Sequence, residues 1–337
     1  MSPARPDADR PGRAAGGRAH APLEPPVLAW LARALAGDPV TATALLSGGY
    51  SNENLLVTTG RSRYVLRRYP RRPAADAART CAVEAALAPR LAEAGVPVPE
   101  VLAADPAGSA AGEPLLLARY VPGATVRATI GPDGTDRAAA AEVAAAAGRA
   151  LAAIGTVTFA RGGFFTGPGL TPSDADLPGS LPEFVERCLR AGSAASALSP
   201  GEMDRVRALA AAADPLARSV AAARQLVHSD YNGKNLLVLA RGGRWSVSAV
   251  LDWEFAFSGS PLTDIGNMLR FREDYPPGFG GAFTAGYTGA GGRLPPDWRE
   301  ISEALDLYAL ADFLTRPPGH RYFGRAVAAI RRRLAPR

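Results

Sequence analysis

Hydrophobic positions near the start of the chain alternate between helical and strand spacing. Residues 25–35 have the spacing of a helix. Two β-rich runs, at 53–59 and 64–69, are separated by a turn at 60–62. Together with the segment that begins at residue 41, they predict a three-stranded meander. Residues 76–94 predict a helix that ends at Gly95, a residue typical of the position just after a helix. Further strands are expected near Val101 and at 115–118. This region therefore predicts one small unit in which an antiparallel sheet is combined with helices.

The rest of the chain has a mainly helical pattern. Helices are expected at 137–154, 181–191, 200–213 and, from residue 262 onward, in a helical region broken by a Pro/Gly-rich segment at 276–296. The Gly- and Pro-rich residues 162–179 predict a loop, and short strands are expected at 225–227, 236–239 and 245–251. We therefore predict an α+β chain with a disordered tail at 1–22, an N-terminal unit at 23–120 and a C-terminal unit at 121–337.

Charge is concentrated at the two ends of the chain. The net charge is +6, but residues 1–20 carry +2 and residues 316–337 carry +7, which leaves −3 for residues 21–315. We therefore expect no nucleic-acid partner and interpret the basic C-terminus as an amphipathic helix; DNA binding by that segment is the alternative, and it would be strongly salt-dependent. No run of 18 apolar residues occurs, so no membrane partner is expected. Cys81 and Cys188 are the only cysteines, which favours a reduced cytoplasmic location.

Candidate chemistry lies in the octet His228-Ser229-Asp230-Tyr231-Asn232-Gly233-Lys234-Asn235 and in Asp252, 17 residues after its end. An acid, an amide five residues later and a second acid match the way a kinase-type site collects a base and two magnesium ligands. Asp230 is the candidate base for an acceptor hydroxyl, in a loop that we expect to be held by a hairpin of the strands at 225–227 and 236–239. Asn235 and Asp252 are the candidate Mg²⁺ ligands. Each of the three has a plain alternative as a turn or strand-end cap.

Two other residues of the octet stay open between roles. His228 is a catalytic candidate, although bracing the loop by hydrogen bonds is the more ordinary role for a histidine there. Lys234 is the only lysine in the chain, and it is a candidate for neutralising the γ-phosphate. The alternative for Lys234 is a solvent-facing side chain with no role.

Together these motifs resemble the aminoglycoside phosphotransferase and choline kinase group, over roughly residues 40–315. The octet matches the catalytic loop H-G-D-x-x-x-x-N of that family, with Ser229 in place of the common glycine, and Asp252-Trp253-Glu254 matches its metal-binding D-[FWY]-E. Residues 259–264, with Ser260 at the position of the first aspartate, resemble the family's G-D-P-x-x-D, which implies that Asp264 anchors the catalytic loop. The resemblance implies a bilobal protein-kinase-like fold, with a small antiparallel-sheet lobe followed by a larger, mainly helical lobe.

The N-terminal part of the resemblance implies nucleotide contacts. The turn at 48–52 matches the family's nucleotide-covering turn, which would place the Ser51 hydroxyl near the phosphates. Arg67 stands where the family usually has a phosphate-gripping lysine, and Glu84 matches the acid that pairs with it. Backbone groups of Arg119 and Val121, in the strand end that resembles the interlobe hinge, are expected to meet the adenine edge.

The resulting hypothesis is an ATP- or GTP-dependent kinase that phosphorylates a hydroxyl of a small molecule with Mg²⁺ as cofactor. The acceptor is an antibiotic, an amino alcohol or a sugar, so a resistance role and a biosynthetic role both stay open. Acids at Glu254, Glu273 and Asp274 are candidates for receiving a cationic, aminoglycoside-like acceptor. A pseudokinase or regulatory module is the alternative, supported only by the arginine at position 67. We expect a monomer or a homodimer.

Overall fold

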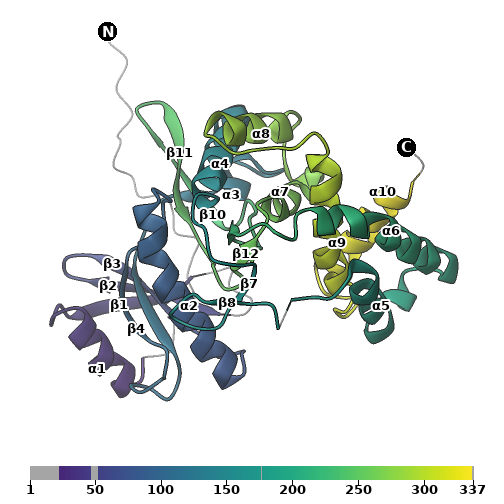
Figure 1. The fold of residues 1–337 in the computed structure, drawn as a ribbon. Coiled ribbons are helices and arrows are strands. Elements are labelled where there is room, and N and C mark those ends of the chain that lie inside the picture. Colours follow the sequence, from purple (N-terminus) through teal and green to yellow (C-terminus); the bar gives the residue numbers. More distant parts are fainter. Residues whose placement is uncertain (1–22, 47–51, 176, 336–337) are drawn as a thin grey trace, which may run out of the picture. The chain divides into compact units, whose positions relative to one another are not determined.

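The computed structural model of the chain describes residues 23–46, 52–175 and 177–335 (Figure 1). The predicted tail at 1–22 and the Ser51 turn lie outside the described residues. The chain divides into two compact units, one from residues 1–85 and 100–120 and the other from residues 86–99 and 121–337. The change of unit at residue 120 coincides with the expected boundary, whereas the segment 86–99 groups with the second unit. One reason is that the backbone oxygen of Pro97 accepts a hydrogen bond from Val250 N, at 2.8 Å.

The first unit is built on a five-stranded antiparallel sheet in the order β1-β2-β3-β5-β4. Its strands are β1 (Val40–Leu45), β2 (Glu53–Thr59), β3 (Arg63–Arg68), β4 (Val101–Asp105) and β5 (Leu115–Arg119). Its helices are α1 (Pro25–Ala34) and the part of α2 (Ala74–Glu93) up to residue 85. The predicted meander is confirmed, and Gly95 follows α2 with a φ of +73°, as a helix-ending glycine does.

The strand β5 is buried on both faces, which explains its uninterrupted apolar sequence. Leu115 and Leu117 pack in one cluster with Trp30 of α1, whereas Leu116 and Ala118 pack in another with side chains of α2. Alternate residues of a strand point to opposite faces of the sheet, so the two helices cover opposite faces.

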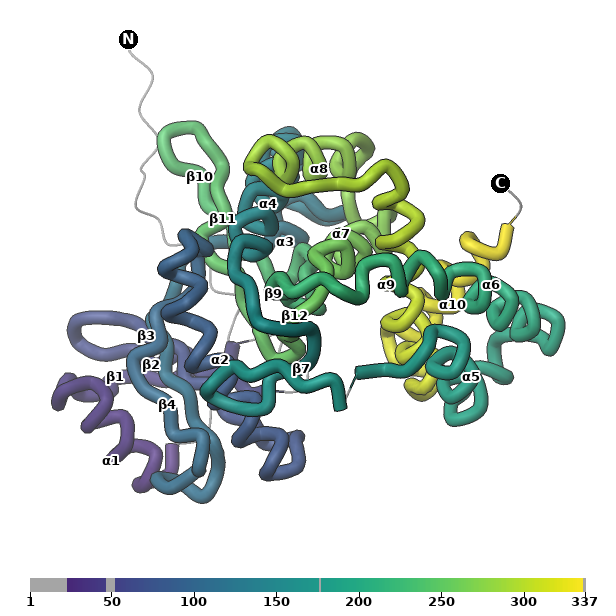
Figure 2. The backbone as a smooth tube through the Cα atoms, in the orientation of Figure 1, coloured from purple at the N-terminus to yellow at the C-terminus, as the bar shows by residue number. Residues whose placement is uncertain are grey.

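The second unit contains two small antiparallel sheets. One has the order β11-β10-β6 and the other the order β8-β7-β12-β9. The first sheet consists of β6 (Ala124–Thr125), β10 (Leu236–Arg241) and β11 (Arg244–Val250), and β10 and β11 form the long hairpin visible in Figure 2. The second consists of β7 (Gly163–Phe165), β8 (Pro172–Ser173), β9 (Gln225–Val227) and β12 (Phe257–Gly259).

Eight α-helices complete the described part of the second unit. They are α3 (Val126–Ile130), α4 (Ala140–Ile154), α5 (Leu181–Ala191), α6 (Pro200–Ser219), α7 (Leu262–Leu269), α8 (Phe279–Gly289), α9 (Trp298–Phe313) and α10 (Phe323–Leu334). Helices α5, α6, α9 and α10 share one apolar core. Helix α8 lies directly on α4, because a side chain at Gly148 would come within 2.0 Å of a backbone oxygen of α8.

The predicted α+β fold class is confirmed, but three local predictions are wrong. The predicted loop at 162–179 contains the short strands β7 and β8, and the predicted break at 276–296 contains the helix α8. The strands on either side of the octet do not form a hairpin, because β9 and β10 belong to different sheets. None of the helices in the described part of the chain is long and apolar enough to span a membrane.

Candidate active site

The octet 228–235 crosses from one sheet of the second unit to the other. It leaves β9 and enters β10, and the segment 251–256 crosses back between the same two sheets, from β11 to β12. Two crossings at one junction bring their side chains together, although 17 residues separate Asn235 from Asp252. This junction replaces the hairpin that the sequence predicted as the support for Asp230.

Asp264 anchors the first crossing, as the resemblance implied. Its two carboxylate oxygens accept hydrogen bonds from the backbone N–H groups of His228 and Ser229, each at 2.8 Å. Asp264 is fully buried, and this loss of hydration raises its pKa to about 6. Ser229 has a φ of +69°, which explains why a glycine is common at this position in the family.

His228 joins the two crossings. Its Nε2 lies 2.8 Å from the backbone oxygen of Leu251, and its Nδ1 accepts from the N–H of Asp230 at 3.2 Å. These partners assign the proton to Nε2. The ring is fully buried, which lowers its pKa, so the histidine is neutral near pH 7. Both ring nitrogens are engaged in bracing the loops, which favours the structural role over the catalytic one.

Asp230 is held by two amide side chains of its own loop. Asn232 Nδ2 donates to one carboxylate oxygen at 2.8 Å, and Asn235 Nδ2 donates to the other at 2.8 Å. Each carboxylate oxygen has a second lone pair, so both remain able to accept a proton from a hydroxyl. Burial raises the pKa of Asp230, as does the negative charge of Asp252, whereas the positive charge of Arg270 lowers it. The side chain is thus fixed in orientation and made more basic than a solvated aspartate.

Asp252 and Asn235 form a donor set that fits a magnesium ion. Because the Nδ2 of Asn235 is engaged with Asp230, its Oδ1 is the atom that remains for a cation. A carboxylate and an amide oxygen are the hard ligands that Mg²⁺ prefers. The charge of Asp252 already acts on Asp230, so a divalent cation here would relieve repulsion between the two carboxylates.

Lys234 faces the C-terminal part of the second unit. Its ammonium group hydrogen-bonds to the hydroxyl of Tyr322 and lies 4.5 Å from the centre of that ring. The side chain is half-buried, and burial lowers its pKa. Lys234 is therefore not a plain solvent-facing lysine.

Arginines neutralise two of the acids that were expected to receive a cationic acceptor. Asp274 lies 2.8 Å from Arg127 and 3.0 Å from Arg325, and Glu273 lies 3.3 Å from Arg325 and 3.5 Å from Arg332. The basic C-terminal helix supplies two of these three arginines. It forms as predicted, but several of its arginines pair with acids of the second unit instead of facing only solvent.

Within the first unit, the predicted pairing of Arg67 with Glu84 is present. The Arg67 Nη1 lies 2.7 and 2.9 Å from the two oxygens of Glu84, and its Nε donates to Asn54 at 3.1 Å. The hydroxyl of Tyr69 also donates to Glu84, at 3.0 Å. Both partners of the ion pair are largely buried, at 14% and 8% exposed, so the guanidinium is held in one orientation.

The two backbone positions expected at the adenine edge differ in what they offer. The N–H of Arg119 donates to the backbone oxygen of Glu100 at 2.8 Å, so that donor is not available to a nucleotide. The Arg119 guanidinium also pairs with Glu100, at 2.8 Å. By contrast, the N–H of Val121 donates to none of the described residues.

Sequence reasoning missed the tyrosine that supports the octet from outside. The Tyr275 hydroxyl accepts from Gly233 N at 2.9 Å and donates to the sulfur of Met268 at 3.3 Å. A side chain at Gly233 would meet that hydroxyl at 2.8 Å, which explains the glycine. A periodicity does not link residues 42 positions apart, so only the unexplained Gly233 could have hinted at this neighbour.

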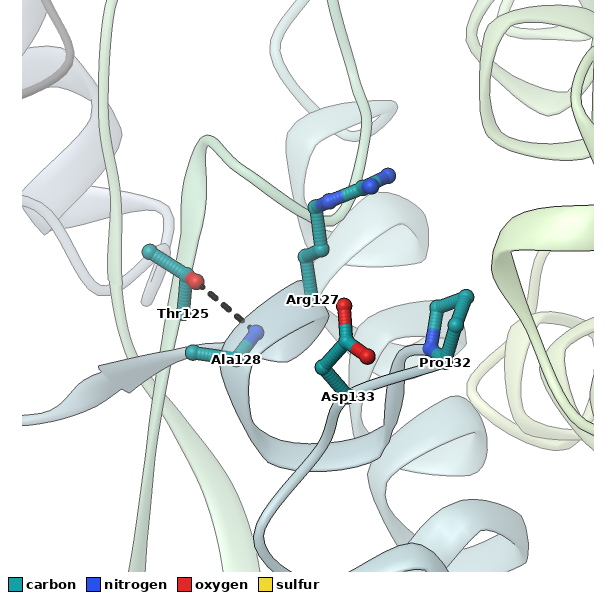
Figure 3. Close-up of a pocket in the computed structure, with 5 residues that line it drawn as sticks. All are labelled: Thr125, Arg127, Ala128, Pro132 and Asp133. Carbon is teal, nitrogen blue, oxygen red and sulfur yellow. Dashed lines mark hydrogen bonds between the residues drawn. The ribbon is translucent and has the colours of Figure 1, made fainter.

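A pocket of 220 Å³ lies at helix α3, lined by Thr125, Arg127, Ala128, Pro132 and Asp133 (Figure 3). The Thr125 hydroxyl caps the helix by accepting from Ala128 N at 3.1 Å, as Figure 3 shows. The N–H of Arg127 donates to the backbone oxygen of Gly233 at 2.7 Å. The pocket therefore belongs to an element that is tied directly to the octet.

This fold, with an anchored H-x-D-x-x-x-x-N loop next to a D-W-E segment, defines the kinase-like class of phosphotransferases. The chain belongs to the phosphotransferase enzyme family, whose model matches residues 43–303. A comparison with curated proteins finds no significant match.

Solved structures of related fold include three antibiotic phosphotransferases. Aminoglycoside phosphotransferase APH(4)-Ia is 20% identical, with a TM-score of 0.64 over 91% of this chain and 98% of that one. The macrolide 2'-phosphotransferase MphH of Brachybacterium faecium is 18% identical, with a TM-score of 0.59 over 90% and 97%. The GDP and kanamycin complex of APH(2")-IIia is 16% identical, with a TM-score of 0.63 over 90% and 96%.

Proposed function

We propose that the protein transfers the γ-phosphate of ATP or GTP to a hydroxyl group of a small molecule. The observation that carries the proposal is the junction where Asp230, Asn235 and Asp252 converge from two chain crossings. In this proposal Asp230 orients the acceptor hydroxyl and accepts its proton as the phosphoryl group is transferred. Mg²⁺, held by Asn235 and Asp252, would supply charge neutralisation at the nucleotide phosphates.

Residues of the first unit are further candidates for nucleotide contacts. Arg67, fixed by Glu84, would offer its positive charge to nucleotide phosphates. This pair supports an active kinase over a pseudokinase, because the arginine occupies the role of the missing lysine with its acidic partner in place. The solved relatives with nucleotide bound, one with AMP-PNP and hygromycin B and one with GDP and kanamycin, support a nucleotide co-substrate. A cytoplasmic location belongs to the proposal, because Cys81 and Cys188 are both free thiols.

The test is a magnesium–nucleotide phosphorylation assay against a panel of hydroxyl acceptors, run with Asp230→Asn. Loss of a general base typically lowers turnover by a factor of about 10² to 10⁴. Asp204→Asn is the matched control, because Asp204 is an exposed residue of α6 paired only with Arg207 in the described structure. If Asp230→Asn keeps the turnover of the unchanged protein, the proposed base is wrong. Chelation of Mg²⁺ is expected to abolish transfer by the unchanged protein.

A further inference from the structure

Lys234 is an ammonium group without an acidic partner. It is the only lysine in the chain, and among the described residues it pairs with no carboxylate. Its one side-chain hydrogen bond goes to the hydroxyl of Tyr322. An ammonium group has three donors, so two remain for another acceptor. The loss of hydration of this half-buried cation is offset only in part by the charge of Asp230, which makes the position unusual for a purely structural lysine.

A second cation lies against the same tyrosine. The guanidinium of Arg321 lies 4.5 Å from the centre of the Tyr322 ring and also hydrogen-bonds to its hydroxyl. The positive charge of Arg321 adds to burial in lowering the pKa of Lys234. The ring itself is fixed by stacking on Phe313, at 4.9 Å between ring centres. Two positively charged side chains therefore converge on one fixed hydroxyl group.

This positive site is close to the proposed base. Lys234 follows Asp230 by four residues in the same loop, and its charge acts on the Asp230 carboxylate. The nearby acids Glu273 and Asp274 are already paired with arginines. A polycationic acceptor would thus meet the Lys234 ammonium and two acids that are already paired with arginines, whereas an anionic one would meet an ammonium with two donors to spare.

We propose that Lys234, positioned by Tyr322, binds an acidic group of the acceptor, so that the substrate is a hydroxy acid or a hydroxylated phosphate ester, not an aminoglycoside. This inference rests on the proposed kinase function and names the class of its acceptor. The ammonium would pair with the carboxylate or phosphate of the acceptor, while the hydroxyl to be phosphorylated lies at Asp230.

The single lysine makes a direct test possible. Full-length protein labelled with ¹³C and ¹⁵N in lysine gives one lysine side-chain NMR signal, which is followed at constant ionic strength with sodium chloride. The probes are two matched pairs, glycolate with glycolamide and glycerol 1-phosphate with glycerol, together with kanamycin. We expect a saturable shift of the signal with glycolate or glycerol 1-phosphate and none with the neutral partners or kanamycin. A tighter saturable shift with glycolate indicates a carboxylate substrate, and a tighter one with glycerol 1-phosphate indicates a phosphate ester.

Two results would overturn the inference. One is a signal that responds equally to the charged and neutral members of both pairs, or to none of the probes. The other is a signal that shifts with Mg²⁺ and AMP-PNP alone and not with the anions, which would assign Lys234 to the nucleotide phosphates. These titrations need no turnover, so their failure is separate from that of the Asp230→Asn test.

A kinetic readout accompanies the titration once an acceptor is found. Lys234→Gln is expected to raise the KM of an anionic acceptor by about 10-fold to 100-fold, the range for a lost hydrogen bond to a charged group. The KM for ATP is expected to stay unchanged, and Lys234→Arg is expected to restore part of the loss. An aminoglycoside acceptor with the same KM in both proteins would refute the anionic class while leaving the kinase function intact.

Discussion

The buried carboxylate of Asp264 should make the free energy of unfolding depend on pH, and the substitution Asp264→Asn tests this. Asp264→Asn keeps the size of the side chain but removes its charge and one of its two acceptors. The remaining oxygen satisfies only one of the backbone N–H groups of His228 and Ser229, each of which now donates to the carboxylate at 2.8 Å. Leaving one buried N–H without a partner costs about 1–3 kcal/mol at any pH. The change in charge, by contrast, matters only where Asp264 is ionised.

The size of the charge effect follows from the raised pKa of Asp264. Burial moves this pKa from 3.8 to about 6, so the native state holds the proton more tightly than the unfolded chain does. The free-energy cost of ionising Asp264 in the folded protein is therefore absent below pH 3.8, grows between pH 3.8 and about pH 6, and is complete above pH 6. It amounts to about 3 kcal/mol at pH 8 and about 1–2 kcal/mol at pH 5. The asparagine variant lacks this cost altogether.

Urea unfolding of both proteins at pH 5 and pH 8 tests the reasoning. At pH 8 the lost hydrogen bond and the relieved charge nearly cancel, so we expect free energies of unfolding within about 2 kcal/mol of each other. At pH 5 the unchanged protein should gain about 1–2 kcal/mol relative to the variant. Titrations of groups that do not interact with Asp264 cancel in this difference, whereas removal of its charge also lowers the pKa of His228. A difference independent of pH, or one that changes in the opposite direction, would refute the assignment of a raised pKa to Asp264.

Four further substitutions, at three positions, probe the support of the site, and each is measured by chemical unfolding. Ser229→Gly is expected to change the free energy of unfolding by less than about 1 kcal/mol, whereas Ser229→Val should cost more than about 2 kcal/mol, because a β-branched residue does not tolerate a φ of +69°. Tyr231→Phe should cost about 1–2 kcal/mol, because the fully buried hydroxyl donates to a backbone oxygen of α4 at 2.7 Å; an unchanged stability would contradict that bond. Asp306→Asn should cost about 3–5 kcal/mol, since it leaves Arg270 and Arg333, each 2.7 Å from the buried carboxylate, without their shared counter-ion; a loss below 1 kcal/mol would show that the pair is solvated.

The elements that sequence periodicity could predict are those with enough length or a clear terminal signal. The meander, the α2 helix ending at Gly95 and the amphipathic C-terminal helix all have such signals. The strands β7 and β8 were missed because they are three and two residues long and are formed only by pairing with each other and with β12. The helix α8 was missed because its composition, rich in glycine, disfavours a helix locally. Its packing on α4 across Gly148 supplies the stabilisation that composition lacks.

The residues of the candidate site that lie close together in the sequence could be predicted, whereas those that depend on contacts with distant residues could not. The spacing of the octet was sufficient to nominate Asp230 and Asn235, because both lie in one short loop. Tyr275 and Tyr322 lie 42 and 88 residues from the loop residues that they contact, so a one-dimensional pattern cannot associate them. The direction in which Lys234 points was likewise undetermined, because it depends on where the chain returns after α9.

The connection of β9 to β10 and of β11 to β12 explains why a histidine, and not only an acid, belongs in this loop. A hairpin would align its own loop, but two crossings between separate sheets need a link between them. His228 supplies that link, since the ring binds Leu251 O at 2.8 Å while the backbone N–H of the same residue binds Asp264. A neutral imidazole can donate at one nitrogen and accept at the other, so it satisfies both crossings without adding a buried charge. The buried ring, together with the backbone hydrogen bond from Leu251 N to Asn235 O at 2.8 Å, thus holds the proposed base and the proposed metal ligand in place. Positioning, not proton transfer, is therefore the role that the contacts of His228 support.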